Sequence, residues 1–131
     1  MLQNTPDIIL VGVGGSLGAI GRYLISDALR SASTIPLGTL VVNVLGSFLL
    51  GMVVTLFKAG IIETPWITLV GIGFLGSFTT MSTFAVETVS ISDDSFQLAA
   101  VNLVLMLVGV LGGSLLGRIL AVVFLARMEG F

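Results

Sequence analysis

The residues that could carry chemistry in this chain are uncharged polar side chains placed within long apolar runs. Asn43 lies several residues inside the run from Gly38 to Ser47. Lipid offers an amide no partner, so Asn43 must either bond across a helix interface or line a hydrated path. Interhelical hydrogen bonds are common and contribute only about 0.6 kcal/mol on average. The residue type alone therefore leaves both interpretations open.

A second polar cluster lies in the stretch from Gly71 to Glu87. Three glycines are followed by five hydroxyl residues: Gly71, Gly73 and Gly76, then Ser77, Thr79, Thr80, Ser82 and Thr83. Glycine weakens a helix, and Ser or Thr side chains can replace backbone hydrogen bonds, so this composition predicts a break in a membrane-spanning helix. A break frees backbone groups that can bind ions, provided that protein or water covers them. The weaker alternative is a continuous helix whose hydroxyls bond back to earlier carbonyls.

Two charged residues lie close to the ends of apolar segments, namely Arg22 and Glu87. Each could extend its apolar stem along a helix and place its charge at the membrane surface without any further role. The chain has neither Cys nor His, which excludes thiolate and imidazole chemistry. No nucleophile, base and oxyanion donor can be combined from the remaining residues, so we predict that the protein is not an enzyme.

The composition indicates that most of the chain is surrounded by lipid and not by water. Of 131 residues, 56% are hydrophobic and only 9% are charged, whereas a soluble domain carries about 25% charged residues. The mean hydropathy is +1.18. A water-soluble globule is excluded, because the polar residues cannot cover its surface. The net charge is −2 and no run of Lys or Arg is present, so nucleic acid is not expected as a partner.

Four apolar segments reach membrane length, at residues 8–25, 37–57, 66–89 and 96–125. We predict an all-α membrane protein with a single transmembrane domain over residues 1–131, four transmembrane helices, and the third helix broken near its middle. Short connections make successive helices antiparallel. The N-terminal segment has no basic region of the kind that precedes a cleaved signal, so the first span is expected to be retained.

The basic residues give almost no preferred orientation in the membrane. Lys58, Arg118 and Arg127 would lie toward one side, and Arg22 and Arg30 toward the other. Lys and Arg near span ends set topology, and three against two is a weak bias. Such a chain could insert in both directions, and two inverted copies could then pair about a two-fold axis. The count therefore predicts a dual-topology, antiparallel homodimer in the lipid bilayer.

Small residues spaced four apart support close helix packing. They are Gly14 with Gly18, Ser47 with Gly51, Gly73 with Ser77, and Gly109 with Gly113 and Gly117. This spacing places them on one face of a helix and lets two backbones approach. Packing is a sufficient explanation for these residues, and they do not identify a function.

Three stretches together resemble the Fluc (CrcB) family of fluoride channels: Gly73–Thr88, Gly38–Asn43 and Gly18–Tyr23. The resemblance extends over the whole chain in length, number of spans and motif order, and the Gly73–Thr88 motif is the most specific. It implies a homodimer in the plasma membrane with two antiparallel pores that pass fluoride passively, which microbes use to expel the anion. It also implies a central structural sodium ion (Na⁺), held by backbone carbonyls that belong here to Gly76 and Thr79.

The resemblance also assigns roles to individual residues. Asn43 matches a pore-lining Asn, Ser82 and Thr83 match pore hydroxyls, and Phe84 matches the second of two pore phenylalanines. Met81 stands where the family usually has the first phenylalanine, which implies one ring contact fewer with the anion. Further candidates are Thr80, Arg22 and Glu87, and Ser114, which would continue the polar track in the last helix. Arg118 falls where an uncharged residue is expected.

This donor set suits fluoride physically. Fluoride is small and strongly hydrated, so a pore must replace water with closely approaching donors such as hydroxyls, an amide and the positive edges of aromatic rings. A bound Na⁺ would add positive potential near the pores.

Two other functions compete with this one. A small dual-topology, proton-coupled exporter resembling the small multidrug transporters would need a carboxylate within the membrane. The resemblance would imply a Glu in the first helix, where this chain has none, and Glu87 lies late in the third span. A membrane structural subunit would explain the glycines but would leave Asn43 and the hydroxyl cluster without a use.

Overall fold

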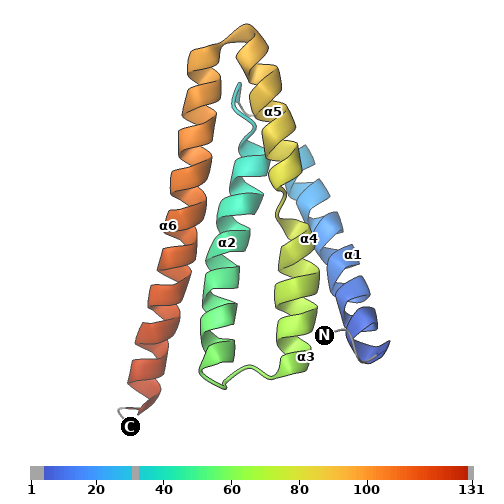
Figure 1. Cartoon of the computed structure of the whole chain (residues 1–131), viewed down its shortest axis with the longest axis vertical. Coiled ribbons are helices and arrows are strands. Elements are labelled where there is room, and N and C mark those ends of the chain that lie inside the picture. The colour runs from blue at the N-terminus through green and yellow to red at the C-terminus, as the bar shows by residue number, and fades with distance from the viewer. Residues whose placement is uncertain (1–4, 31–32, 130–131) are drawn as a thin grey trace.

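The computed structural model describes residues 5–30 and 33–129, and they form a bundle of helices (Figure 1). The elements in chain order are α1 (Thr5–Ala28), α2 (Leu37–Lys58), α3 (Thr64–Trp66), the π-helix η1 (Ile67–Leu75), α4 (Gly76–Phe78), α5 (Met81–Asp94) and α6 (Phe96–Glu129). The elements from α3 to α5 follow one another along a single path and form the third span, which has a bend between α4 and α5.

Within the described residues, four helical stretches are long and apolar enough to cross a membrane. They are Asp7–Ala28, Leu37–Lys58, Thr64–Asp94 and Phe96–Met128. The prediction of an all-α chain with four membrane-length helices is confirmed. The largest difference from the predicted bounds is at the end of the third span, which continues to Asp94 instead of ending at residue 89.

Local sequence explains where several of these helices begin. Pro36 directly precedes α2 and Pro65 lies in the first turn of α3, where the missing N–H of proline costs nothing. Ser95 separates α5 from α6, and its hydroxyl accepts a hydrogen bond from the Leu98 N–H at 3.3 Å, which satisfies one free donor at the start of α6.

The helices pack as two pairs. α1 lies against η1 and α4, and α2 lies against α6. In the first pair, a Cβ atom at Gly18 would overlap the carbonyl oxygen of Phe74. In the second pair, a Cβ atom at Gly117 would overlap the carbonyl oxygen of Phe48, and one at Gly51 would overlap that of Ser114. These glycines therefore allow close backbone contact, as their spacing predicted.

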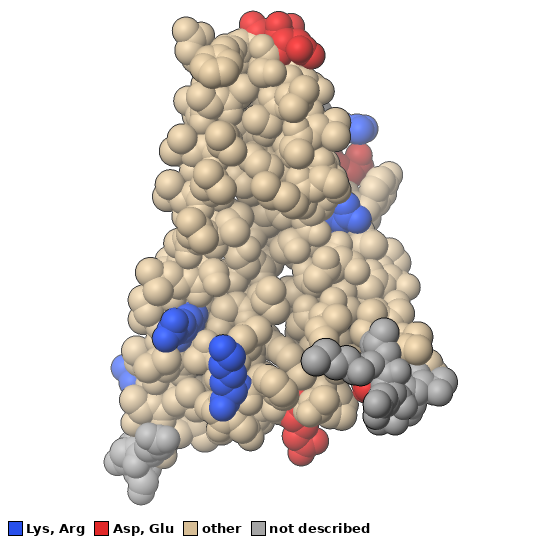
Figure 2. Space-filling model, viewed as in Figure 1, with Lys and Arg blue, Asp and Glu red and all other residues tan. Residues whose placement is uncertain are grey.

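The outer faces of the bundle are apolar and the basic side chains are segregated. Leu111 of α6 is 70% exposed and Val86 of α5 is 68% exposed, as expected for surfaces that meet lipid or another protein. Figure 2 shows the Lys and Arg side chains of one face in two groups that are separated along the long axis. The α5–α6 hairpin extends beyond the start of α2 (Figure 1).

Candidate functional site at the break in the third span

The third span is interrupted at Thr79 and Thr80, close to its middle. α4 ends at Phe78 and α5 begins at Met81. Between them the backbone is extended, with φ −82° and ψ 153° at Thr79, and φ −150° and ψ 109° at Thr80. The predicted break is therefore confirmed, and the alternative of a continuous helix is wrong.

The side-chain amide of Asn43 on α2 holds this break. Its Nδ2 donates to the carbonyl oxygen of Thr80 at 3.0 Å, and the N–H of Thr80 donates to its Oδ1 at 2.7 Å. Asn43 is only 5% exposed. One side chain thus satisfies both backbone polar groups of Thr80, which lipid would leave unpaired. Asn43 makes the interhelical bond that its sequence position allowed, and one Nδ2 hydrogen remains for another acceptor.

The break releases particular carbonyl groups. In a continuous helix the N–H of Thr80 would bond to the carbonyl of Gly76, and that of Thr83 to the carbonyl of Thr79. Here the Thr80 N–H bonds to Asn43, and the Thr83 N–H bonds to the hydroxyl of Thr80 at 3.3 Å. The carbonyls of Gly76 and Thr79 have therefore lost their helical donors. Unwound backbone carbonyls are known ligands of Na⁺ in membrane proteins, so this donor set fits the predicted cation.

Three hydroxyls form a connected cluster at the start of α5. The Thr80 hydroxyl donates to Thr83 Oγ1 at 2.9 Å and lies 3.3 Å from Ser82 Oγ. Thr80 is also the N-cap of α5, since its Oγ1 accepts the N–H of Thr83. Thr79 differs, because its hydroxyl donates back to the carbonyl of Leu75 at 3.1 Å. The cluster therefore consists of Thr80, Ser82 and Thr83, next to Asn43.

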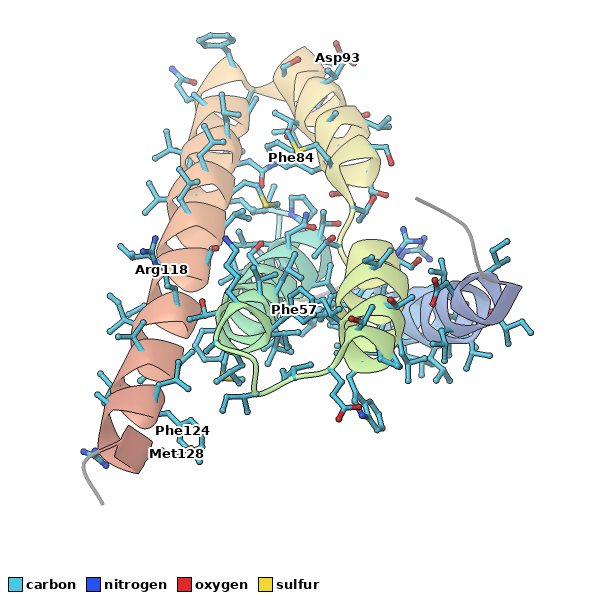
Figure 3. The ribbon with its side chains drawn as sticks, turned by 60° about the horizontal axis from the view of Figure 1, so that its bottom comes forward. Phe57, Phe84, Asp93, Arg118, Phe124 and Met128 are labelled. Carbon is cyan, nitrogen blue, oxygen red and sulfur yellow. The ribbon has the colours of Figure 1, made fainter. Side chains whose placement is uncertain are left out.

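The two positions matched to pore phenylalanines lie in different environments. Phe84 is 2% exposed and lies between α5 and α6 (Figure 3). Met81 is the first residue of α5 and is 65% exposed. In one chain, therefore, the ring of Phe84 is covered while the Met81 side chain faces outward.

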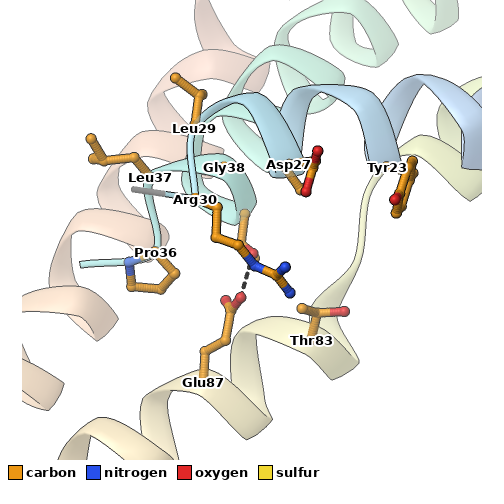
Figure 4. A pocket seen from close by; sticks show the side chains of 11 residues that line it. Tyr23, Asp27, Leu29, Arg30, Pro36, Leu37, Gly38, Thr83 and Glu87 are labelled. Carbon is orange, nitrogen blue, oxygen red and sulfur yellow. Dashed lines mark hydrogen bonds between the residues drawn. The ribbon is translucent and has the colours of Figure 1, made fainter. Parts of the chain in front are cut away.

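A polar cavity of about 420 Å³ adjoins the hydroxyl cluster at the end of α1. Figure 4 shows residues from α1, the α1–α2 connection, α2 and α5 around it; the polar ones are Tyr23, Ser26, Asp27, Arg30, Thr39, Thr83 and Glu87. Within it, the Thr39 hydroxyl donates to Glu87 Oε1 at 2.9 Å (Figure 4). Because Thr83 belongs to both the cavity and the cluster, polar groups continue from the cavity to the break.

Several predicted site residues lie outside this group. Ser114 of α6 lies beside Gly51 of α2, eight residues and about 12 Å along the helix from Asn43. Arg22 lies on α1, and its buried Nε has no hydrogen-bond partner within the described part of the chain. Arg118 lies on the outer side of α6, where it is exposed (Figure 3).

Two polar residues that bond to α5 were not predicted as site residues from the sequence. Thr39 lies one helical turn before Asn43 and bonds to Glu87, and the spacing of four residues could have revealed it. Asn102 of α6 is fully buried and bonds to Thr88 of α5. It is an amide inside an apolar run, the same signal that pointed to Asn43.

Four apolar helices, with uncharged polar groups gathered at a break in the third, define a multi-pass α-helical membrane protein with a discontinuous third span.

Comparison with known proteins identifies the family. Residues 9–119 match the family described as CrcB-like protein, Camphor Resistance (CrcB). A fluoride-specific ion channel FluC of Methanococcus maripaludis is 38% identical over 90% of this chain and 98% of the relative. The channel of the same name from Methanocaldococcus jannaschii is 40% identical over 88% and 94%, and that from Shewanella oneidensis is 45% identical over 76% and 82%.

The chain belongs to the CrcB-like family, as its motifs predicted. Membership in a family of ion channels also confirms the prediction that it is not an enzyme.

Proposed function

We propose that this protein is a fluoride-selective channel through which fluoride passes passively across the plasma membrane. The observation that carries the proposal is the continuous series of uncharged polar groups from the polar cavity to the break, formed by Thr83, Thr80 and Asn43. The names of the relatives, which are fluoride-specific ion channels, support the choice of ion.

The chemistry of the cluster suits a small anion that must lose its water. Ser82, Thr83 and the free Nδ2 hydrogen of Asn43 offer hydroxyl and amide donors that approach fluoride closely, and the ring edge of Phe84 adds a weaker positive contact. Uncharged donors bind more weakly than a fixed cation would, and conduction requires that the ion can leave. Glu87 lines the cavity and accepts a hydrogen bond from the Thr39 hydroxyl.

The conducting form in this proposal is a dual-topology homodimer with two antiparallel pores. Ser82 is exposed in one chain although it lies within the third span. Apart from the Thr80 hydroxyl at 3.3 Å, lipid offers the exposed Ser82 hydroxyl no further partner, and a second copy would cover it. The nearly balanced basic residues allow both orientations, and two inverted copies form a closed two-fold pair.

The same proposal includes a structural Na⁺ at the break. The carbonyls of Gly76 and Thr79 would hold it, because the break deprives both of their helical donors. Gly76 is exposed in one chain, which leaves its carbonyl region open to a second copy. A bound Na⁺ would supply positive potential near the hydroxyl cluster and would join the freed carbonyls of two copies.

Purified protein in liposomes tests this function. Under a potassium gradient with valinomycin, we expect voltage-driven fluoride efflux that needs no proton gradient, together with much slower chloride efflux. Proton-coupled exchange of organic cations would favour the exporter instead. The absence of any flux from correctly assembled protein would leave the structural subunit as the remaining function. Protein-free liposomes from the same preparation control for leakage of HF.

A further inference from the structure

Asn102 of α6 connects that helix to the backbone of α5. Its Nδ2 donates to Thr88 Oγ1 at 2.8 Å, and the Thr88 hydroxyl donates to the carbonyl of Phe84 at 2.8 Å. A hydroxyl that accepts one bond and donates another has a fixed orientation. The result is a series of two hydrogen bonds from Asn102 on α6 through Thr88 to the backbone of Phe84, whose ring lies between α5 and α6.

Stability of the helix pair does not explain an amide at this position. Asn102 is 0% exposed, and its Oδ1 is buried without a hydrogen-bond partner in the described part of the chain. An unpaired buried acceptor is unfavourable, and an apolar residue of the same size would remove that cost. The amide therefore serves something other than close packing of α6.

We propose that Asn102 is a positioning residue for fluoride conduction, acting through Thr88 to hold α5 in its conducting orientation. This inference rests on the function proposed above. Asn43 of α2 fixes the start of α5 through Thr80, and Asn102 fixes it again two turns later, about 12 Å along the helix. Between these two points lie the residues assigned to the pathway: Ser82, Thr83, Phe84 and Glu87.

Two attachments from different helices prevent α5 from rotating about its own axis. A rotation would move the Ser82 and Thr83 hydroxyls away from the Asn43 amide and would turn the Phe84 ring out of the α5–α6 interface. Loss of the second attachment should therefore alter which anions pass, in addition to any effect on assembly.

The test compares Asn102→Leu and Thr88→Val, which each remove the bond, with Thr88→Ser, which keeps the hydroxyl. Leu103→Ala, at a neighbouring exposed position of α6, is the matched control. We expect fluoride efflux per assembled protein to fall about three- to eighteen-fold in the first two variants, the range for interhelical hydrogen bonds in membranes. Their fluoride-to-chloride ratio should fall as well, while Thr88→Ser and Leu103→Ala retain wild-type values.

Hydrogen–deuterium exchange of the α5 amides gives a readout that does not depend on fluoride. Exchange should be faster in Thr88→Val than in wild type or Thr88→Ser. If Asn102→Leu does not assemble, Thr88→Val alone decides the question. Normal efflux and an unchanged fluoride-to-chloride ratio in assembled Thr88→Val would overturn the positioning role, even if less protein assembles. A wild-type protein that passes no fluoride would instead refute the proposed function, and that result is separate from the variant comparison.

Discussion

The Asn43→Leu variant would remove both hydrogen bonds at the break while keeping a side chain of similar size in a site that is 5% exposed. The N–H and the carbonyl of Thr80 would then lack the partner that the structure gives them. Two unpaired buried groups cost about 2 to 6 kcal/mol together, at about 1 to 3 kcal/mol each.

The lower end of this range is the better expectation. Interhelical hydrogen bonds in membranes contribute only about 0.6 kcal/mol on average, because freed groups find other partners. A loss of about 2 kcal/mol corresponds to a roughly thirtyfold smaller equilibrium constant between the native break and other conformations of the span. We therefore expect fluoride efflux per protein to fall by at most about that factor.

Efflux from liposomes, measured with a fluoride electrode, and thermal unfolding in detergent would be recorded on the same preparation. Val42→Ala is the matched control, because Val42 is 0% exposed on the same helix and makes no bond to Thr80. Losing two buried methyl groups should lower stability by a comparable amount, about 1 to 3 kcal/mol, but should leave fluoride selectivity intact. Wild-type efflux in Asn43→Leu would refute the idea that this amide maintains the break.

Four further outcomes follow from the same contacts. Met81→Phe should raise fluoride efflux about two- to tenfold if a ring edge at this exposed position contacts the anion, and equal efflux and selectivity in both proteins would contradict that role. Gly117→Leu should prevent assembly, because a Cβ atom there already overlaps the Phe48 carbonyl; size-exclusion chromatography beside Gly112→Leu, where the Cβ atom meets open space, checks this. Replacing Na⁺ with N-methylglucamine should slow fluoride entry and weaken the dimer, as measured by efflux and subunit exchange. Reporter fusions at the C-terminus should be active on both sides of the membrane, and activity on one side alone would exclude dual topology.

The four spans could be predicted from the sequence because hydropathy and span length act locally. The break could also be predicted, since glycines and hydroxyls within one short stretch weaken the helix around themselves. The π-helix from Ile67 to Leu75, which packs against α1, could not, because no feature of its local composition distinguishes it from an ordinary α-helix.

The sequence predicted which types of residue form the candidate site better than it predicted their contacts. Asn43 was identified, but its bonding to Thr80 joins residues that are 37 positions apart and depends on the tertiary fold. Ser114 was predicted to continue the polar track although its helix aligns only loosely with the motif, and in one chain it lies beside Gly51; its role stays a prediction. Asn102 was overlooked although it is an amide inside an apolar run, and its bond to Thr88 on another helix also depends on the tertiary fold.

The length of α6 has a consequence for how the protein meets water. Its 34 residues extend about 51 Å, whereas the hydrocarbon core is about 30 Å thick. Even a tilt of about 40° leaves nearly 10 Å of helix outside the core. The turn that carries Asp93 lies at one end of α6 (Figure 3), and we expect it to project into the aqueous phase. A fluorophore or antibody tag placed there would report on the protein from solution without touching the residues at the break.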